Sequence, residues 1–142
     1  MILTRLVCGD YVDNETVLGD VSVLDMSEGV AGPLCTQLLA DLGAQVLKVE
    51  RPGLGDASRG AGPFLTDGVG QRQSALFLSL NQSKKGITIN IETKDGKRVL
   101  KELAQEHDIL VESFPPGHLT GLGLDHSVLA QVNPGLVFTS IT

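Results

Sequence analysis

The chain has 142 residues, of which 42% are hydrophobic and 20% charged, as in a folded soluble domain rather than a disordered segment. Its net charge of −6 arises in residues 1–70, which carry 10 acidic and 4 basic residues, whereas residues 71–142 carry 7 of each. This balance argues against nucleic-acid binding, which requires a basic surface. No apolar run approaches the ~18 residues of a membrane-spanning helix, so we expect no membrane association.

The regular fold is expected to begin near residue 21, after an N-terminal lead-in over residues 1–20 that is polar from residue 10 onward. Residues 21–24 form a β-rich run that predicts a strand, and residues 45–50 predict a second one. Between them, Pro33 suits the first turn of a helix. The predicted apolar face of that helix consists of three leucines, Leu38, Leu39 and Leu42.

A long loop follows over residues 51–73, rich in glycine and proline and without a periodic pattern. Residues 74–80 then predict a short helix or buried turn. Residues 81–85 predict a polar turn, in which we expect Lys84 and Lys85 to be solvated.

The second half of the chain again alternates strands and helices. Isoleucine recurs at every second position over residues 86–92, which predicts a strand. Thr93 is placed to cap a helix that runs to about residue 105. The remaining predicted elements are a strand, a glycine-punctuated link, a short helix capped by Asp125 and a last strand, over residues 108–113, 119–124, 125–132 and 136–142.

This order predicts an α/β fold with a Rossmann-like, mostly parallel sheet and helices on both faces. Ligands bind such sheets beyond the carboxyl ends of the strands. The segments expected at that edge are residues 25–32, 50–56, 90–93 and 113–117. NAD binding is not expected, because the first loop, Gly29-Val-Ala-Gly32, lacks the Gly-x-Gly-x-x-Gly pattern.

Structural roles alone could explain several residues at this edge. Gly32 and Pro33 fit a turn and a helix start, Arg51 a surface charge, and Phe114 a core position. Asp25 and Glu28 could be nominated as nucleophiles, although Asp25 fits better as a strand-end cap. The two cysteines match no metal-binding spacing, so no metal site is expected. They fit a reducing compartment, and we expect the protein to be cytoplasmic, or mitochondrial in a eukaryote.

Four segments resemble the family III CoA-transferases. They read Val-Leu-Asp-Met-Ser-Glu-Gly-Val-Ala-Gly-Pro (23–33), Leu-Ala-Asp-Leu-Gly-Ala-Gln-Val-Leu-Lys-Val-Glu-Arg-Pro-Gly-Leu-Gly-Asp (39–56), Leu-Asn-Gln-Ser-Lys-Lys-Gly (80–86) and Val-Glu-Ser-Phe-Pro-Pro-Gly (111–117). The resemblance extends over about residues 20–142. It implies that residues 21–142 are the N-terminal, Rossmann-like, CoA-binding portion of the large domain. The fold is then incomplete relative to the family, without the second domain and the C-terminal return.

The resemblance also implies how CoA lies on this domain, as a substrate rather than a tightly bound cofactor. The implied contact residues are Val30 and Ala31 through the loop backbone, Arg51 at the adenosine diphosphate part, Ile89, Asn90, Ile91 and Glu92 around the adenine, and Ser113, Phe114 and Pro115 along the pantetheine.

The family moves CoA between carboxylic acids through an aspartate that forms anhydride and thioester intermediates. The resemblance places that aspartate beyond the Ser140-Ile-Thr segment, so no catalytic residue is assigned and these residues alone are expected to be inactive. The implied partners are an acyl-CoA, a small carboxylic acid and a second copy in an interlocked dimer, which this portion is not expected to reproduce. The alternatives are a non-catalytic truncated isoform or fragment and an α-methylacyl-CoA racemase-like protein. The length of residues 57–80 favours a transferase over a racemase.

Overall fold

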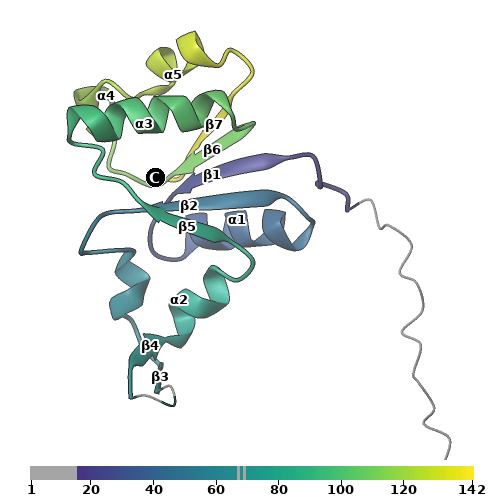
Figure 1. Ribbon diagram of the computed structural model, residues 1–142, viewed down its shortest axis with the longest axis vertical. Coiled ribbons are helices and arrows are strands. Elements are labelled where there is room, and N and C mark those ends of the chain that lie inside the picture. The colour runs from purple at the N-terminus through teal and green to yellow at the C-terminus, as the bar shows by residue number, and fades with distance from the viewer. Residues whose placement is uncertain (1–15, 67, 69) are drawn as a thin grey trace, which may run out of the picture.

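A five-stranded parallel sheet forms the centre of the protein (Figure 1). The computed structural model describes residues 16–142 except 67 and 69, so most of the predicted lead-in lies outside the described residues. The strands lie in the order β5-β2-β1-β6-β7. Their bounds are Ser22–Met26 for β1, Gln45–Glu50 for β2, Lys85–Thr88 for β5, Ile109–Glu112 for β6 and Val137–Ser140 for β7.

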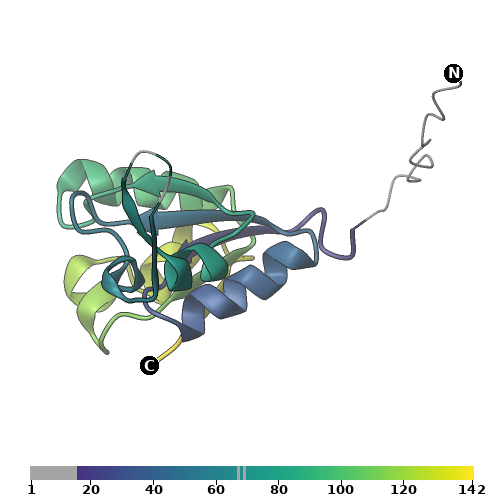
Figure 2. The ribbon, with the colours of Figure 1, turned by 90° about the horizontal axis from the view of Figure 1, so that it is seen from below.

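Helices cover both faces of this sheet, so the predicted α/β architecture is confirmed. Helix α1 (Ala31–Asp41) lies on one face, whereas α3 (Lys94–Gln105), α4 (His118–Leu122) and α5 (His126–Val132) lie on the other (Figure 1). The view from below shows α1 and α3 on opposite sides of the strands (Figure 2). A short helix, α2 (Ala75–Leu80), precedes β5.

The central strands are buried on both faces because their neighbouring side chains point to opposite cores. Val23 packs with Val46 and Val111 beneath α1. Leu24, the next residue, packs with Leu110 in the larger core beneath α3, α4 and α5. Val23, Leu24 and Leu110 have no solvent exposure. Near-continuous apolar runs are therefore what a parallel sheet between two helical layers requires.

Side-chain caps begin the later helices at the positions predicted for them. Thr93 Oγ1 accepts a hydrogen bond from the Gly96 amide at 3.0 Å at the start of α3. Asp125 Oδ1 accepts one from the Val128 amide at 3.2 Å at the start of α5. Each cap satisfies an amide that the first helical turn leaves without a partner.

Two segments predicted to lack regular structure contain it. The loop over residues 51–73 holds a 3₁₀ helix, η1 (Ala57–Gly60), and the strand β3 (Phe64–Thr66), which pairs antiparallel with β4 (Arg72–Ser74). The link over residues 119–124 lies mostly in α4. Polar side chains stabilise the first segment, because Asp56 caps η1 and Ser74 Oγ donates to the Ala61 carbonyl. Such bonds leave no apolar periodicity in the sequence.

The predicted apolar face of α1 is wrong for two of its three leucines. Leu38 is 56% exposed and Leu42 is 50% exposed, and only Leu39 packs beneath the sheet. The helix instead buries Gly32, Pro33, Thr36 and Gln37. This rotation follows from a polar contact, since Thr36 Oγ1 donates to Asp25 Oδ2 at 2.6 Å in the interior.

Candidate functional site

The order in which successive strands are added to the sheet reverses between β1 and β6, and the carboxyl ends of these two strands mark this topological switch point. The chain first proceeds from β1 toward β2 and β5, and later continues on the other side of β1 with β6 and β7. Ligands of doubly wound sheets bind at such a point. Two loops meet here, because the Glu28 amide donates to Ser113 Oγ at 2.8 Å.

The loop from Ser27 to α1 contains backbone amide groups that make no hydrogen bond within the part of the chain that the structure describes. Among the described residues, the N–H groups of Val30, Ala31 and Gly32 have no hydrogen-bond acceptor. Val30 and Ala31 are exposed, and Pro33 contributes no N–H to the first helical turn. The start of α1 can therefore bind an anionic or carbonyl oxygen through its backbone.

Four buried charged residues, Asp25, Lys48, Asp56 and Lys84, lie behind this loop, and we call them the buried ionic cluster. Lys84 Nζ lies 3.0 Å from Asp25 Oδ2, and Lys48 Nζ lies 2.8 Å from Asp56 Oδ2 and 3.8 Å from Asp25 Oδ2. Each of these side chains is at most 3% exposed. Two lysines and two aspartates make the cluster neutral overall, which is the condition for burying charge.

The buried ionic cluster fixes the loop at several backbone atoms. Lys48 Nζ donates to the Ser27 carbonyl at 2.7 Å, and Lys84 Nζ donates to the Pro33 carbonyl at 2.9 Å. Asp56 Oδ1 accepts from the Gly29 amide at 3.1 Å. These bonds leave the amides between Gly29 and Pro33 free while holding the loop on either side of them.

The positions of Lys84 and Asp25 correct two interpretations. Lys84 is not solvated in a turn, and burial lowers the pKa of its ammonium group although the Asp25 carboxylate opposes this shift. Asp25 does more than cap its strand, because it also accepts hydrogen bonds from Ser27 and Thr36. It is fully buried, so it is unsuited to attack a substrate.

A narrow crevice at the carboxyl edge, with a volume of about 10 Å³, brings together four of the predicted contact residues. Arg51, Ile89, Ile91 and Phe114 line it from three separate segments of the chain, together with Met26, Glu28, Val49 and Glu50. Ile89 and Ile91 follow β5, are 8% and 6% exposed, and also belong to the larger core. The crevice therefore has an apolar base and a charged rim.

The other predicted residues do not line this crevice. Asn90 and Glu92 are exposed beside it, where Asn90 Oδ1 accepts from the Glu92 amide at 3.0 Å. Pro115 lines a neighbouring cavity of about 280 Å³ at the ends of β6 and β7. Phe114 lies between the two hollows, lining both, and stacks on His118 with ring centres 4.9 Å apart.

The sequence-based prediction missed Lys48 and Asp56, which position the loop. Lys48 interrupts the apolar run of β2 yet is only 2% exposed. A lysine at a strand position that would otherwise be buried needs an anionic partner nearby. That signal was present in the sequence, but it does not identify the partner, because Asp56 comes from the segment predicted to be structureless.

We expect the free energy of unfolding to fall as the pH drops below about 4.5. The Arg59 guanidinium lowers the pKa of Glu50; burial raises that of Asp56, but contacts with Lys48 and Ser58 outweigh it and lower the pKa overall. Because both folded-state pKa values lie below the unfolded ones, the folded state binds fewer protons. The stabilisation is present above the unfolded values and is lost as the pH falls through the folded ones. Urea titrations at several pH values would measure this, and a pH-independent midpoint would contradict it.

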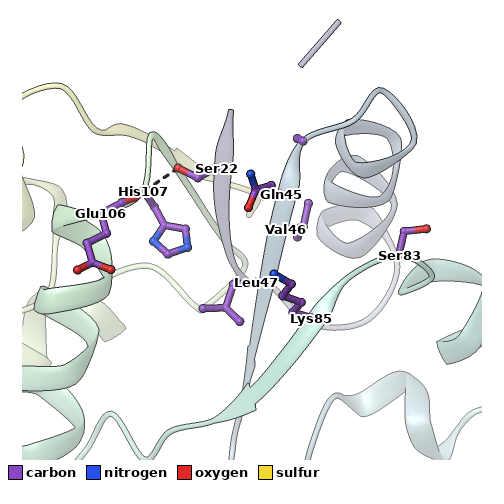
Figure 3. A pocket seen from close by; sticks show the side chains of 9 residues that line it. Ser22, Gln45, Val46, Leu47, Ser83, Lys85, Glu106 and His107 are labelled. Atoms are coloured by element: carbon purple, nitrogen blue, oxygen red, sulfur yellow. Dashed lines mark hydrogen bonds between the residues drawn. The ribbon is translucent and has the colours of Figure 1, made fainter. Parts of the chain in front are cut away.

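A separate cavity of about 400 Å³ lies at the opposite edge of the sheet (Figure 3). Ser22, Gln45 and Lys85 line it where their strands begin, and Glu106 and His107 line it from the end of α3. None of the predicted contact residues lines it. It is therefore not part of the carboxyl-edge site.

Neither a metal centre nor a membrane segment is found in residues 16–142, with 67 and 69 left aside. No group of three or more His, Cys, Asp or Glu side chains there could hold a metal ion. No helix in that part is long and apolar enough to cross a membrane.

Comparison with known proteins gives matches over most of this chain, to a family model, to curated proteins and to solved structures. The model of CoA-transferase family III matches residues 18–142. The chain is 42% identical over 130 residues to the succinyl-CoA:glutarate CoA-transferase of Mus musculus, covering 92% of this chain and 29% of that protein. It is 44% identical over 124 residues to the formyl-CoA:oxalate CoA-transferase of Bradyrhizobium diazoefficiens, covering 87% and 28%. A CAIB/BAIF family protein from Brucella suis superposes with a TM-score of 0.83 at 39% identity, covering 89% of this chain and 33% of that one. The chain thus spans about three tenths of the length of the curated relatives it matches.

Proposed function

The chain belongs to CoA-transferase family III, and from this premise we propose that residues 21–142 form the CoA-binding portion of an enzyme that moves CoA between carboxylic acids. The two relatives named above are transferases for succinyl-CoA with glutarate and for formyl-CoA with oxalate. Their names favour a transferase over the racemase-like alternative. The substrates of this protein are accordingly an acyl-CoA and a small carboxylic acid, and CoA binds as a substrate.

One observation carries this proposal: free backbone donors and a guanidinium lie at one edge of the sheet. The loop offers the amides of Val30 and Ala31, both in exposed residues, and Arg51 lies on the rim of the adjoining crevice. CoA carries phosphate groups on its nucleotide and amide carbonyls along its pantetheine. A guanidinium binds phosphate through two parallel hydrogen bonds, and helix-start amides bind oxygen atoms.

The residues divide between the parts of CoA. Arg51 contacts the adenosine diphosphate part, and Ile89, Asn90, Ile91 and Glu92 flank the adenine. Ser113, Phe114 and Pro115 border the pantetheine. The Ser113 hydroxyl holds this segment beside the loop by accepting a hydrogen bond from the Glu28 amide. The aspartate nucleophile of the family mechanism has no counterpart among these residues, so they provide binding and orientation of the substrate. A non-catalytic truncated isoform or fragment is the second candidate function.

Replacing Arg51 with glutamine should weaken CoA binding about tenfold, because charge-assisted hydrogen bonds contribute about 1.5–3 kcal/mol and the lost ion pair with Glu28 offsets part of that. Calorimetric titration of the purified chain with CoA measures the change. Arg98→Gln is the matched control, since it removes the same charge from an exposed pair with Glu102 on α3. Absence of CoA binding by the unaltered chain, or equal binding by both variants, would contradict the proposed site.

A turnover assay separates the two candidate functions. Succinyl-CoA or formyl-CoA would be supplied with glutarate or oxalate, and thioester exchange followed by chromatography. We expect no exchange by residues 1–142 alone, and exchange once a chain extended to the length of the relatives is used. Turnover by the 142-residue chain would show that the nucleophile lies within it.

A further inference from the structure

We propose that Glu28 determines how strongly Arg51 binds phosphate groups, because its carboxylate occupies the face of the guanidinium that a phosphate would use. The inference rests on the proposed function, and assigns to this site an internal competitor for the ligand. An incoming phosphate must displace Glu28 from Arg51. A ligand without phosphate groups does not need to displace Glu28, so removing the Glu28 carboxylate should not change how tightly it binds.

The contact between Glu28 and Arg51 has the geometry of an anion-binding site that is already filled. Arg51 Nε and Nη2 donate to Glu28 Oε1 at 3.0 and 2.9 Å, and Nη2 also donates to Oε2 at 3.0 Å. Guanidinium groups bind carboxylates and phosphates through the same pair of parallel donors. The two anions therefore compete for one face of Arg51.

The exposure of the pair allows this exchange. The Arg51 side chain is 51% exposed and that of Glu28 is 26% exposed, so solvent and ligand can reach the contact. Ion pairs this exposed contribute little to stability. The pair is thus different in kind from the buried ionic cluster, whose members are almost completely shielded from solvent.

The loop does not depend on the Glu28 carboxylate for its shape. The Glu28 amide is bound by Ser113 Oγ, the Gly29 amide by Asp56, and the Ser27 carbonyl by Lys48. The carboxylate can therefore leave Arg51 by rotation of the side chain while the backbone stays in place. Removing the carboxylate should free Arg51 without altering the loop amides.

Neighbouring groups make Arg51 the phosphate-binding cation of this rim. Arg59 is the next arginine along the chain, but its guanidinium binds both oxygens of Glu50 at 2.7 Å. That Glu50 side chain is 9% exposed, so its ion pair is better shielded than the one at Arg51. An incoming phosphate can exchange with Glu28 more readily than with Glu50.

The test is a set of calorimetric titrations with CoA and with pantetheine, which lacks the phosphates. If the Glu28 carboxylate is paired with Arg51 in about nine molecules out of ten, Glu28→Gln should bind CoA about tenfold more tightly. Pantetheine binding should be unchanged. The gain should disappear when Glu28→Gln is combined with Arg51→Gln, because no guanidinium is then left to release.

Two controls keep the outcomes separate. Glu106→Gln removes the same charge at the opposite edge of the sheet, and unfolding curves show whether Glu28→Gln leaves stability unchanged. If the unaltered chain binds CoA and Glu28→Gln binds it no better, the inference is wrong and the proposed function stands. A gain that persists without Arg51, or that Glu106→Gln reproduces, also overturns the inference. If no protein binds CoA, both the inference and the proposed function are overturned.

Discussion

Replacing Lys84 with methionine is expected to lower the free energy of unfolding by about 3–5 kcal/mol, because the change removes one partner of a buried ion pair. Lys84 Nζ lies 2.8–3.0 Å from oxygen atoms of Asp25, Pro33, Thr36 and Asn81, so all three of its N–H groups have acceptors within reach. Without the ammonium group, the Asp25 carboxylate loses its nearest cation while remaining fully buried. Urea unfolding followed by circular dichroism measures the loss.

Lys85→Met provides the matched control, since the adjacent lysine is exposed and belongs to the same segment. Its effect should stay within about 0.5 kcal/mol, as is usual for surface substitutions. Combining Lys84→Met with Asp25→Asn should cost less than the sum of the two single changes, because the pair shares one interaction. Equal stability of the Lys84 and Lys85 variants would show that the buried ionic cluster does not support the fold.

Replacing Gly32 with alanine is expected to destabilise the protein by about 1–3 kcal/mol, which is typical of overpacking a filled interior. A Cβ atom at Gly32 would lie 2.2 Å from Ser27 Cβ and 2.3 Å from Ser27 Oγ. Ser27 cannot move freely, since Asp25 binds both its amide and its hydroxyl. The change should therefore also displace the loop and weaken CoA binding, and titrations of stability and of binding would measure both effects.

Gly121→Ala is the corresponding control, because a Cβ at that position in α4 meets nothing within 4 Å. Alanine at a helical position of this kind is neutral or stabilises by about 0.4–1 kcal/mol. A Gly32 variant as stable as the Gly121 variant would mean that the close approach of α1 to Ser27 is dispensable.

Most of the fold could be predicted because local patterns and global packing agree in the parallel strands. Apolar runs predicted the strands, and Thr93 and Asp125 predicted the starts of two helices. The elements stabilised by polar contacts could not be predicted in this way. The Asp56 side chain both caps η1 and accepts a hydrogen bond from the Gly29 amide, and no periodicity in the sequence indicates either contact.

For the candidate site too, some features could be predicted from the sequence and others could not. Its place at the carboxyl edge followed from the order of strands and helices, and the structure brings Arg51, Ile89, Ile91 and Phe114 to one crevice there. The assignment of these residues to parts of CoA stays a prediction. Lys84 was misplaced because a polar turn in sequence gives no sign that its lysine reaches 59 residues back to Asp25.

By itself, the sequence determined the family and the α/β class, and it predicted the edge of the sheet where a ligand would bind, because these depend on local apolar periodicity and on short contiguous motifs. Only the tertiary structure decided the roles of the charged side chains. Whether Arg51 is free or paired, and whether Gly32 is a mere turn residue or a contact point for Ser27, depends on atoms far apart in the chain. Electrostatic and steric effects act over a few ångströms in space, and the order of residues does not state which of them come that close.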